Sequence, residues 1–416
     1  MIKKTKVNKL NSIIGPGIVT GASDDDPSGI ATYTQAGAAF GFQFLWTAII
    51  TYPMMVAIQE MCARIGIVTR QGLTGILKKY YPRPVLWIMI IFSFPAIILN
   101  ISADLAGMGA VGHMLLPSIP PFVFALIFCV LLLFNLIKLS YRKIANILKF
   151  LCLVLLCYII VPFLSRQHWD EIVKNTFFPH IVFDRNFFAL LVGILGTTIS
   201  PYLFFWQTSM EVEEMREQKL FVNRTIIHDM KNDVRFGIFF SNSIFYFIIL
   251  AAATELHNNG ITEVFTVDQA AQALRPLAGN ASYFLFAFGV IGTGLLAIPV
   301  LAGSLSYIIS EAFGWSAGLN KKFEQAKGFY IVMSISMICA LAFDLIGFNP
   351  VKALIYTAIL YGLTAPVLIG IIIHICNNKK IMGSYTNSRW SNFVGILTLV
   401  VMTFAAIILV WQSITA

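Results

Sequence analysis

Long apolar segments separated by short polar connections run along almost the whole chain. Each is long enough, or nearly so, to cross the apolar core of a bilayer as a helix. The pattern predicts an all-α integral membrane protein, with residues 1–416 forming one transmembrane domain. The eleven expected spans are residues 13–40, 42–66, 84–112, 120–138, 145–165, 186–209, 236–256, 281–310, 329–346, 350–375 and 391–414.

The first apolar segment is interrupted near its middle by Asp24, Asp25 and Asp26, and Pro27 follows directly. A carboxylate at membrane depth costs roughly 2.5 to 3.5 kcal/mol on insertion scales. Pro27 removes a backbone donor, so a helix cannot continue smoothly through it. Broken backbone is tolerated in a bilayer only where protein buries it or where it lines a watery cavity. We therefore expect a cation site at the break of a discontinuous helix. The alternative is a surface loop between two short apolar segments.

The sixth segment is interrupted in the same way, because Pro201 follows hydroxyl residues that include Thr197 and Ser200. Interruptions in the first and sixth segments fall at corresponding positions of two five-helix halves. This indicates inverted repeats with a binding site at the membrane midplane. Carbonyls freed at both breaks, together with Asp26, form the oxygen-rich cage that hard cations such as Mg²⁺ prefer. The expected repeats are residues 13–165 and 186–375, followed by an extra helix at 391–414.

Composition and charge agree with a membrane protein and give its orientation. Hydrophobic residues make up 58% of the chain and charged residues 12%, about half the charged share of an ordinary soluble protein. The net charge of +9 reflects basic connections on one side of the membrane, and not nucleic-acid binding. Of the 29 Lys and Arg residues, 24 lie in connections that are cytoplasmic if the N-terminus is cytoplasmic, which makes the C-terminus extracellular. The five on the other side are Arg166, Lys174, Arg185, Arg275 and Lys352.

Motifs of other functional classes are missing from the sequence. It contains no phosphate-binding loop, no HExxH and no nucleophile elbow, so we expect no enzyme activity and no cofactor. The six cysteines form no CxxC pair and are interpreted as small buried hydrophobic residues. The expected partners are the lipid bilayer and a divalent metal ion as substrate. No obligatory protein partner is evident.

Several motifs resemble the Nramp family of divalent-metal transporters, over most of the chain and most strongly in its first hundred residues. The resemblance implies a LeuT-type fold of inverted five-helix repeats, with eleven transmembrane helices of which 1 and 6 are broken. It also implies import of divalent metal ions. The matching stretches are Gly15-Pro16-Gly17, 26–32, 35–38, 41–46, Gln59-Glu60, 64–69 and 104–106.

The departures from the family motifs bear on the choice of metal. The family's first-helix motif is Asp-Pro-Gly-Asn, where this chain has Asp26-Pro27-Ser28-Gly29. Its sixth-helix motif is Met-Pro-His, where this chain has Ser200-Pro201-Tyr202. A Met thioether favours transition metals, so its loss favours a hard ion that stays partly hydrated. The combination resembles the Nramp-related magnesium transporter branch. The resemblance and the two breaks together give an expected set of metal ligands: Asp26, Gly29, Thr197, Ser200, Asp25 and Ser23.

The family's proton-coupling residues are also altered. An acidic residue follows the third-helix Asp by three positions in the family, and here that position is Gly107. Tyr202 replaces the sixth-helix His, and its ordinary pKa of about 10 suits it poorly to carry protons near neutral pH. Asp24, Asp104 and Tyr202 are candidates for a polar relay or gate. We expect Asp24 or Asp25 to line the outer vestibule, the alternative being plain solvated charges. Asp104 is alternatively a structural hydrogen-bond centre.

Three functions remain open from the sequence. The first is import of Mg²⁺, and also of Mn²⁺, by alternating access without proton coupling. The second is a proton-coupled Mn²⁺/Fe²⁺ importer, which would need a substitute soft ligand. The third is an amino-acid symporter on the same fold, which three carboxylates at the break disfavour.

Other polar positions carry weaker expectations. Glu60 and Arg64 are spaced for a local ion pair on one helix. Asn100 is a candidate to extend a polar track beside Asp104, and Tyr361 to approach the site from the tenth span. Two charged segments, 166–185 and 210–235, are expected to be solvated connections, the second partly helical.

Overall fold

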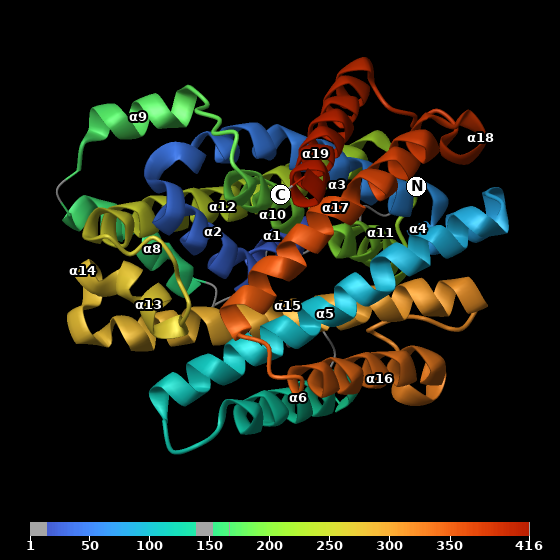
Figure 1. Cartoon of the computed structure of the whole chain (residues 1–416). Coiled ribbons are helices and arrows are strands. Elements are labelled where there is room, and N and C mark those ends of the chain that lie inside the picture. Colours follow the sequence, from blue (N-terminus) through green and yellow to red (C-terminus); the bar gives the residue numbers. More distant parts are fainter. Residues whose placement is uncertain (1–14, 139–152, 166, 416) are drawn as a thin grey trace.

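The computed structural model describes residues 15–138, 153–165 and 167–415, and within these ranges all regular structure is helical (Figure 1). The helices up to residue 217 are α1 (Pro16–Asp24), α2 (Pro27–Phe40), η1 (Gly41–Phe44), α3 (Trp46–Thr69), α4 (Leu73–Tyr80), α5 (Arg83–Leu115), α6 (Pro121–Lys138), η2 (Leu153–Leu156), α8 (Cys157–Leu164), α9 (Trp169–Phe177), α10 (Arg185–Thr198) and α11 (Pro201–Glu217). The later helices are α12 (Arg224–Glu255), η3 (His257–Asn259), α13 (Val267–Ala271), η4 (Gln272–Leu274), α14 (Arg275–Ala278), η5 (Gly279–Ala281), α15 (Ser282–Phe313), η6 (Phe323–Gln325), α16 (Lys327–Asp344), α17 (Pro350–Asn377), α18 (Lys379–Met382) and α19 (Arg389–Thr415).

A helix occurs in each of the eleven predicted spans, although part of the fifth, 145–152, lies outside the described residues. Eight helical stretches are long and apolar enough to cross a membrane on their own, one of them formed by α10 and α11 together. The stretches Pro27–Phe44 and Trp46–Thr69 pass the same test only as a pair, bent by 107°. The polar residues at the first break lower the mean hydropathy of the first span, and those at the inner end of α3 lower that of the second.

Two helices are broken at the predicted prolines. The first span divides into α1 and α2, with Pro27 as the first residue of α2 and Asp26 as its N-cap. The sixth divides into α10 and α11, with Pro201 opening α11 and Ser200 as its N-cap. Proline suits the first helical position because the amide it lacks has no partner there in any case. Both prolines therefore end one helix and begin another at the centre of the bundle.

The broken helices pack against unbroken ones at glycine contacts. A Cβ on Gly21 of α1 would overlap the backbone of Gly237 of α12. A Cβ on Gly196 of α10 would likewise overlap the backbone around Gly362 of α17. Such close approach of backbones is typical of helix packing in membranes. These contacts hold the two breaks between α12 and α17 (Figure 1).

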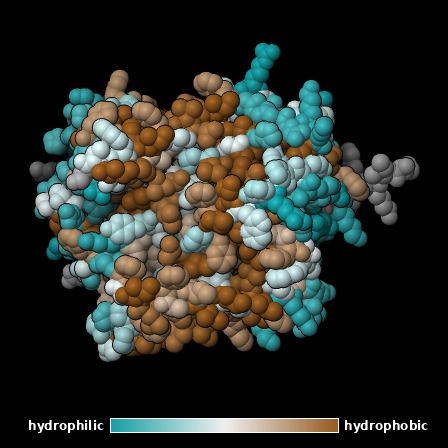
Figure 2. All heavy atoms as spheres, turned by 45° about the vertical axis from the view of Figure 1, so that its right-hand side comes forward, coloured by the Kyte–Doolittle hydropathy of each residue, from teal (hydrophilic) through white to brown (hydrophobic). Residues whose placement is uncertain are grey.

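The outer surface is apolar where a bilayer would surround it. Figure 2 shows hydrophobic side chains across the middle of the molecule, with hydrophilic ones gathered toward its left and right edges. Several large hydrophobic side chains of α6 and α19 are exposed, among them Phe134, Phe404 and Trp411. These exposed apolar faces suit contact with lipid. Together with the number of helices that are long and apolar enough to cross a bilayer, they indicate a multi-pass membrane protein.

Segment 210–235 agrees only in part with the expected solvated, partly helical connection. Helix α11 continues to Glu217 and α12 begins at Arg224, so the non-helical part is only 218–223. Glu211 is buried and accepts a hydrogen bond from Gln207 over 2.9 Å. The expectation that this segment is partly helical is therefore confirmed, and most side chains of 216–229 are exposed, whereas the last turns of α11 contribute buried side chains. The other expected solvated connection, 166–185, contains the amphipathic helix α9, whose Ile172 and Thr176 are buried.

Candidate functional site

Asp26 lies at the centre of the first break and is only 2% exposed. Its Oδ1 accepts a hydrogen bond from the Gly29 amide over 2.7 Å, which makes it a side-chain cap of α2. A carboxylate at a helix N-terminus is stabilised by the free amides and by the helix dipole. The break therefore holds a fixed carboxylate at the protein centre.

A polar track leads from this carboxylate into α5. Asn100 donates from Nδ2 to Asp26 Oδ2 over 2.9 Å, and the same nitrogen is 3.5 Å from Asp104 Oδ2. All three side chains are buried. The expectation that Asn100 extends the track beside Asp104 is thus confirmed. Asp104 Oδ1 and Asn100 Oδ1 have no hydrogen-bond partner among the described residues.

Asp24 and Asp25 do not line an open vestibule, contrary to the expectation. Each is 1% exposed. Ser241 Oγ of α12 lies 3.0 Å from Asp24 Oδ2 and 3.2 Å from Asp25 Oδ1. The close packing of α1 on α12 turns both side chains toward this helix. Their other oxygens, Asp24 Oδ1 and Asp25 Oδ2, are buried and without a hydrogen-bond partner in the described part of the chain.

The second break faces the first. A Cβ on Gly29 would lie 3.2 Å from Thr197 Oγ1 and 3.4 Å from the Asp24 carbonyl oxygen. Thr197 is therefore a neighbour of Gly29 and Asp24, although α10 is far from α1 and α2 in sequence. Ser200 Oγ donates within its own span, to the carbonyls of Gly196 over 3.1 Å and Thr197 over 2.5 Å. Of the expected ligands, Gly29 and Thr197 are thus neighbours across the two breaks, while the Ser200 hydroxyl is engaged by its own backbone.

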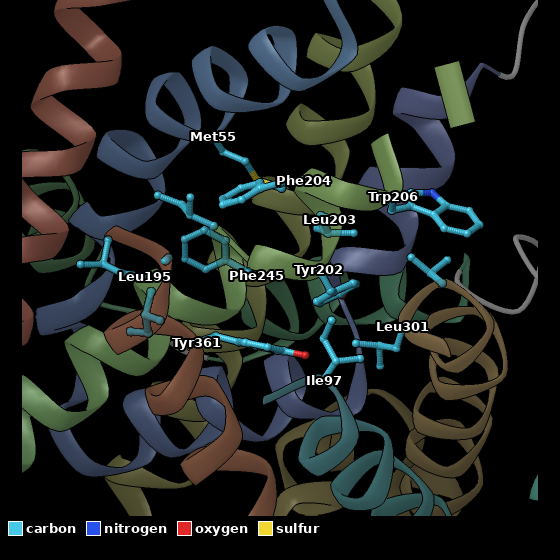
Figure 3. Close-up of a cluster of buried hydrophobic side chains, with 14 of the residues drawn as sticks. Met55, Ile97, Leu195, Tyr202, Leu203, Phe204, Trp206, Phe245, Leu301 and Tyr361 are labelled. Carbon is cyan, nitrogen blue, oxygen red and sulfur yellow. The ribbon is translucent and has the colours of Figure 1, made fainter. Parts of the chain in front are cut away.

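Tyr202 links the two breaks directly. Its hydroxyl donates to the Ser23 carbonyl over 3.0 Å, while Ser23 Oγ bonds the Val19 carbonyl. Its ring lies 5.6 Å from that of Tyr361, which thus approaches the site from α17 as expected (Figure 3). Tyr361 Oη has no hydrogen-bond partner among the described residues. Tyr202 is therefore a bridge between the two broken helices.

The buried carboxylates have no basic partner among the residues that the structure describes. No ion pair found in 15–138, 153–165 and 167–415 involves Asp24, Asp25, Asp26 or Asp104. An uncompensated buried carboxylate is costly, and a bound cation lowers that cost. Within those ranges there is no group of three or more His, Cys, Asp and Glu side chains arranged to hold a metal ion.

Sequence reasoning missed Ser241, which is the only residue of α12 that contacts the candidate carboxylates through a hydrogen bond in the described structure. A serine and an asparagine, Ser241 and Asn242, lie side by side in the apolar part of α12. Polar residues within a membrane helix often mark functional positions, so this pair could have been singled out from the sequence. Nothing in their spacing shows that Ser241 faces the first break while Asn242 bonds the Ala48 carbonyl of α3.

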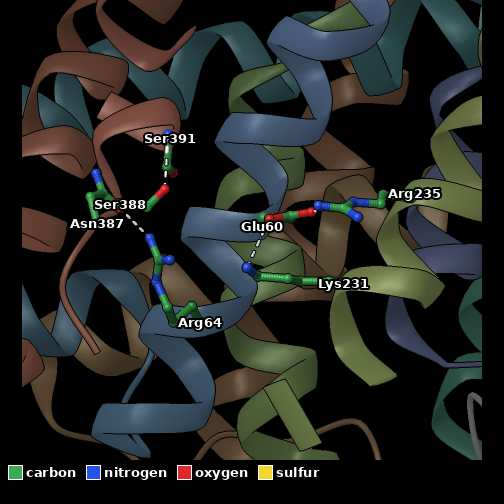
Figure 4. Close-up of polar contacts among 7 residues, drawn as sticks. All are labelled: Glu60, Arg64, Lys231, Arg235, Asn387, Ser388 and Ser391. Atoms are coloured by element: carbon green, nitrogen blue, oxygen red, sulfur yellow. Dashed lines mark hydrogen bonds and ion pairs between the residues drawn. The ribbon is translucent and has the colours of Figure 1, made fainter. Parts of the chain in front are cut away.

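Glu60 and Arg64 do not form the local ion pair that their spacing suggested. Glu60 pairs with two residues of α12, Arg235 at 2.8 Å and Lys231 at 3.9 Å (Figure 4). Arg64 points the other way and donates from Nη2 to Asn387 Oδ1. The partners across the helix interface replace the partner on the same helix.

Comparisons with known proteins agree with this arrangement. A family model described as "Natural resistance-associated macrophage protein-like", Nramp, matches residues 17–412. The chain is 27% identical over 399 residues to the divalent metal cation transporter MntH of Klebsiella pneumoniae, covering 92% of this chain and 90% of that one. It is 25% identical over 411 residues to MntH of Yersinia enterocolitica, covering 96% and 95%.

Solved structures resemble the whole fold. The manganese transporter of Eremococcus coleocola superposes with a TM-score of 0.77 at 18% identity, over 96% of this chain and 86% of that one. MhsT in complex with L-phenylalanine superposes with a TM-score of 0.61 at 12% identity, over 94% and 98%. These likenesses confirm the LeuT-type fold. Since the family model covers nearly all of the sequence, the chain belongs to the Nramp family.

Proposed function

We propose that this protein imports divalent metal ions across a membrane by alternating access, with Mg²⁺ as the main substrate and Mn²⁺ also carried. The observation that supports this best is the buried Asp26 carboxylate, held at the N-terminus of α2 opposite a second broken helix. The similar proteins named above are divalent metal cation transporters and a manganese transporter.

Mg²⁺ is favoured over transition metals by the chemistry of the groups around the breaks. Asp26 offers a carboxylate, Thr197 a hydroxyl next to Gly29, and Asp25 an unpartnered oxygen. All are hard oxygen ligands, which suit Mg²⁺ bound with part of its water shell. Ser200 brings no sulfur to this position. The expected ligand set stays as proposed, since the Ser23 and Ser200 hydroxyls donate their hydrogens to nearby carbonyls and keep their oxygen lone pairs for an ion.

One observation supports the alternative of a transition-metal importer. A Cβ on Gly294 of α15 would meet the Met108 sulfur and would lie 3.3 Å from Pro27 Cγ. A thioether thus lies close to the first break, one helical turn beyond Asp104. If it contacts the ion, it supplies the soft ligand that this alternative requires. A Met108→Leu variant separates the two cases, because it should leave Mg²⁺ transport unchanged and lower Mn²⁺ transport only if the sulfur binds.

Transport without proton coupling follows from the altered relay positions. Gly107 has no titratable group, and a Cβ there would lie 3.1 Å from a methyl carbon of Leu354. The Tyr202 hydroxyl is engaged by the Ser23 carbonyl. Asp104 still carries a carboxylate, so it remains the candidate either for a polar relay or for a structural hydrogen-bond centre.

Alternating access requires the inner side to open, and α1 is the element best arranged to do so. Asp233 of α12 accepts hydrogen bonds from the Gly17 amide over 2.6 Å and the Gly15 amide over 3.1 Å. We propose that release of these bonds frees α1 from α12. The orientation follows the distribution of basic residues, with a cytoplasmic N-terminus and an extracellular C-terminus. The two halves, 13–165 and 186–375, act as inverted repeats.

Uptake into proteoliposomes tests the proposal. Mg²⁺, Mn²⁺, Ca²⁺ and an amino-acid mixture are supplied in parallel to the wild-type protein and to Asp26→Asn. We expect Mg²⁺ and Mn²⁺ uptake by the wild type only. Uptake of amino acids instead of metal would establish the symporter alternative, and Mn²⁺ uptake without Mg²⁺ would establish the transition-metal alternative.

A further inference from the structure

A groove of about 350 Å³ lies between α3, α12 and α19, away from the two breaks. It is on the side of the membrane that the basic connections predict to be cytoplasmic. One end is polar and the other is apolar. Its lining residues are Tyr52, Pro53, Val56, Ala57, Glu60, Arg64, Lys231, Arg235, Ser388, Trp390, Ser391 and Val394.

The polar end carries excess positive charge. Glu60 is its one acidic residue, and it is already paired with Arg235 and Lys231. Arg64 is only 6% exposed and forms no ion pair in the described residues. Its Nη2 donates to Asn387, while its Nε is buried without any hydrogen-bond partner there. A buried guanidinium in this state calls for an anion.

The N-terminus of α19 lies at the same end of the groove and also favours an anion. Ser388 and Ser391 line the groove at the N-terminus of this helix, near the Asn387 that holds Arg64 (Figure 4). Ser388 Oγ accepts from the Ser391 amide over 3.1 Å, so the first turn is ordered. The N-terminus of a long helix favours a phosphate group through its amides and dipole.

The apolar end continues onto the lipid-facing surface. Pro53, Val56 and Val394 form this wall. Tyr52 packs edge-to-face against the exposed Phe239, with ring centroids 6.1 Å apart. Trp390, at the rim, is exposed, as is typical of aromatic residues at the membrane interface. An acyl chain can therefore follow the wall from the polar end into the bilayer.

We propose that this groove binds an anionic phospholipid, with the phosphate held by Arg64 and Lys231 at the start of α19 and one acyl chain along Pro53, Val56 and Val394. Basic pockets between membrane helices on the cytoplasmic side are suited to such headgroups. The apolar wall selects a lipid over free phosphate, since inorganic phosphate gains nothing from it. The lipid joins α3, α12 and α19 and supplies the counter-charge that Arg64 lacks.

The test uses the full-length protein in bilayers of equal parts phosphatidylcholine and phosphatidylglycerol. Native mass spectrometry counts the phosphatidylglycerol retained by the wild type and by three variants. Arg64→Gln removes the buried charge, and Ser391→Leu fills the groove while every charge stays. Lys380→Gln is the matched control, because Lys380 is an exposed basic residue of α18 on the same side and outside the groove. We expect about tenfold less retained lipid in the first two variants and no change in the control.

Two results would overturn the proposal. Equal retention by the wild type and a folded Ser391→Leu variant would mean that lipid binds elsewhere. The other result comes from the melting temperature of the wild type. If inorganic phosphate added in pure phosphatidylcholine raises this temperature as much as phosphatidylglycerol does, the site recognises phosphate alone. If Arg64→Gln fails to fold, Ser391→Leu and Lys231→Gln decide, the latter with an expected loss of about fivefold.

Discussion

Asn100 donates a hydrogen bond to Asp26 over 2.9 Å, so a residue of α5 fixes the carboxylate at the break between α1 and α2. The Gly29 amide holds the other carboxylate oxygen over 2.7 Å. With both oxygens oriented, Asp26 would lose little conformational freedom on binding an ion as proposed, and preorganisation of this kind strengthens binding.

The first prediction is that the charge of Asp26 is indispensable for transport. Asp26→Asn should lower metal uptake to the level of empty liposomes, because the main charged ligand is lost. Asparagine also caps helices well, so it should keep the bond to the Gly29 amide and the fold. Asp26→Ala should have the same effect on uptake and cost about 1 kcal/mol of stability through the lost cap. Uptake and thermal unfolding of both variants are the measurements, and retained Mg²⁺ uptake by folded Asp26→Asn would move the site elsewhere.

The second prediction concerns metal selectivity at the second break. Ser200→Met should raise the affinity for Mn²⁺ and Cd²⁺ relative to Mg²⁺, because a thioether is a soft ligand. Calorimetry measures the ratio, and Ser200→Leu controls for side-chain size without sulfur. Adding Gly29→Asn restores the family's second side-chain ligand. That side chain must fit beside Thr197 and Tyr33, each 3.2 Å from the new Cβ, so the single variant is the cleaner test. An unchanged Cd²⁺-to-Mg²⁺ ratio would mean that position 200 does not face the ion.

The breaks themselves could be predicted because their signals are local. Asp26-Pro27 and Ser200-Pro201 each combine a capping residue with a proline, and both prolines begin helices. The identity of neighbouring helices could not be predicted in the same way. Ser241 is 217 residues from Asp24 and reaches it because Gly21 packs on Gly237, a contact that no local pattern encodes.

The spacing of charged residues along one helix also gave a wrong prediction, because Glu60 has a competing partner on another helix. Glu60 and Arg64 satisfy the helical i,i+4 rule, worth about 0.2 to 0.5 kcal/mol on an exposed helix. In the folded bundle Arg235 lies within hydrogen-bond distance of Glu60 and takes its place. Charged residues near Glu211 suggested a solvated connection, although this side chain is buried. Helix packing therefore decides which charges are exposed.

The third prediction tests Ser241 as a positioning residue. Ser241→Ala should weaken Mg²⁺ binding by about tenfold, since a hydrogen bond to a charged group contributes about 1.5 to 3 kcal/mol. Ser243→Ala is the matched control, because the Ser243 hydroxyl bonds the Phe239 carbonyl of its own helix. If Ser241 acts through Asp25, the loss should shrink in an Asp25→Asn background. Equal effects in both backgrounds, measured by calorimetry, would limit Ser241 to a structural role.

The fourth prediction concerns opening of the inner side. Asp233→Ala should release the amides of Gly15 and Gly17 and shift α1 toward a detached state. A Thr20→Cys reporter, on the buried face of α1 itself, should then react about tenfold faster with a thiol reagent supplied on the cytoplasmic side, as two bonds to a charged acceptor are lost. Asp229→Ala serves as control, since Asp229 is exposed one turn earlier on α12. Equal labelling rates in the two variants would mean that Asp233 does not hold α1 against α12.

The last prediction is that metal transport is not coupled to protons. A coupled carrier needs a titratable group near the ion that changes charge between the two sides, and a path by which the proton leaves. By the motif resemblance, Gly107 and Tyr202 stand where an acidic residue and a His are expected. His113, the imidazole of α5, is engaged by the Ile119 carbonyl at 2.8 Å near the end of that helix. Asp26 bound to Mg²⁺ is held in its charged form by the ion.

A pH-sensitive dye inside proteoliposomes measures coupling directly, with valinomycin and potassium clamping the voltage during Mg²⁺ or Mn²⁺ uptake. We expect the internal pH to follow the leak of empty liposomes while metal accumulates. Asp104→Asn gives the decisive comparison, because Asp104 is the carboxylate that remains in the relay and lies beside Asn100. Without coupling, this variant should keep a voltage-driven metal flux that does not change with external pH. Metal-dependent acidification in the wild type that disappears in Asp104→Asn would instead identify Asp104 as a proton carrier and favour the transition-metal alternative.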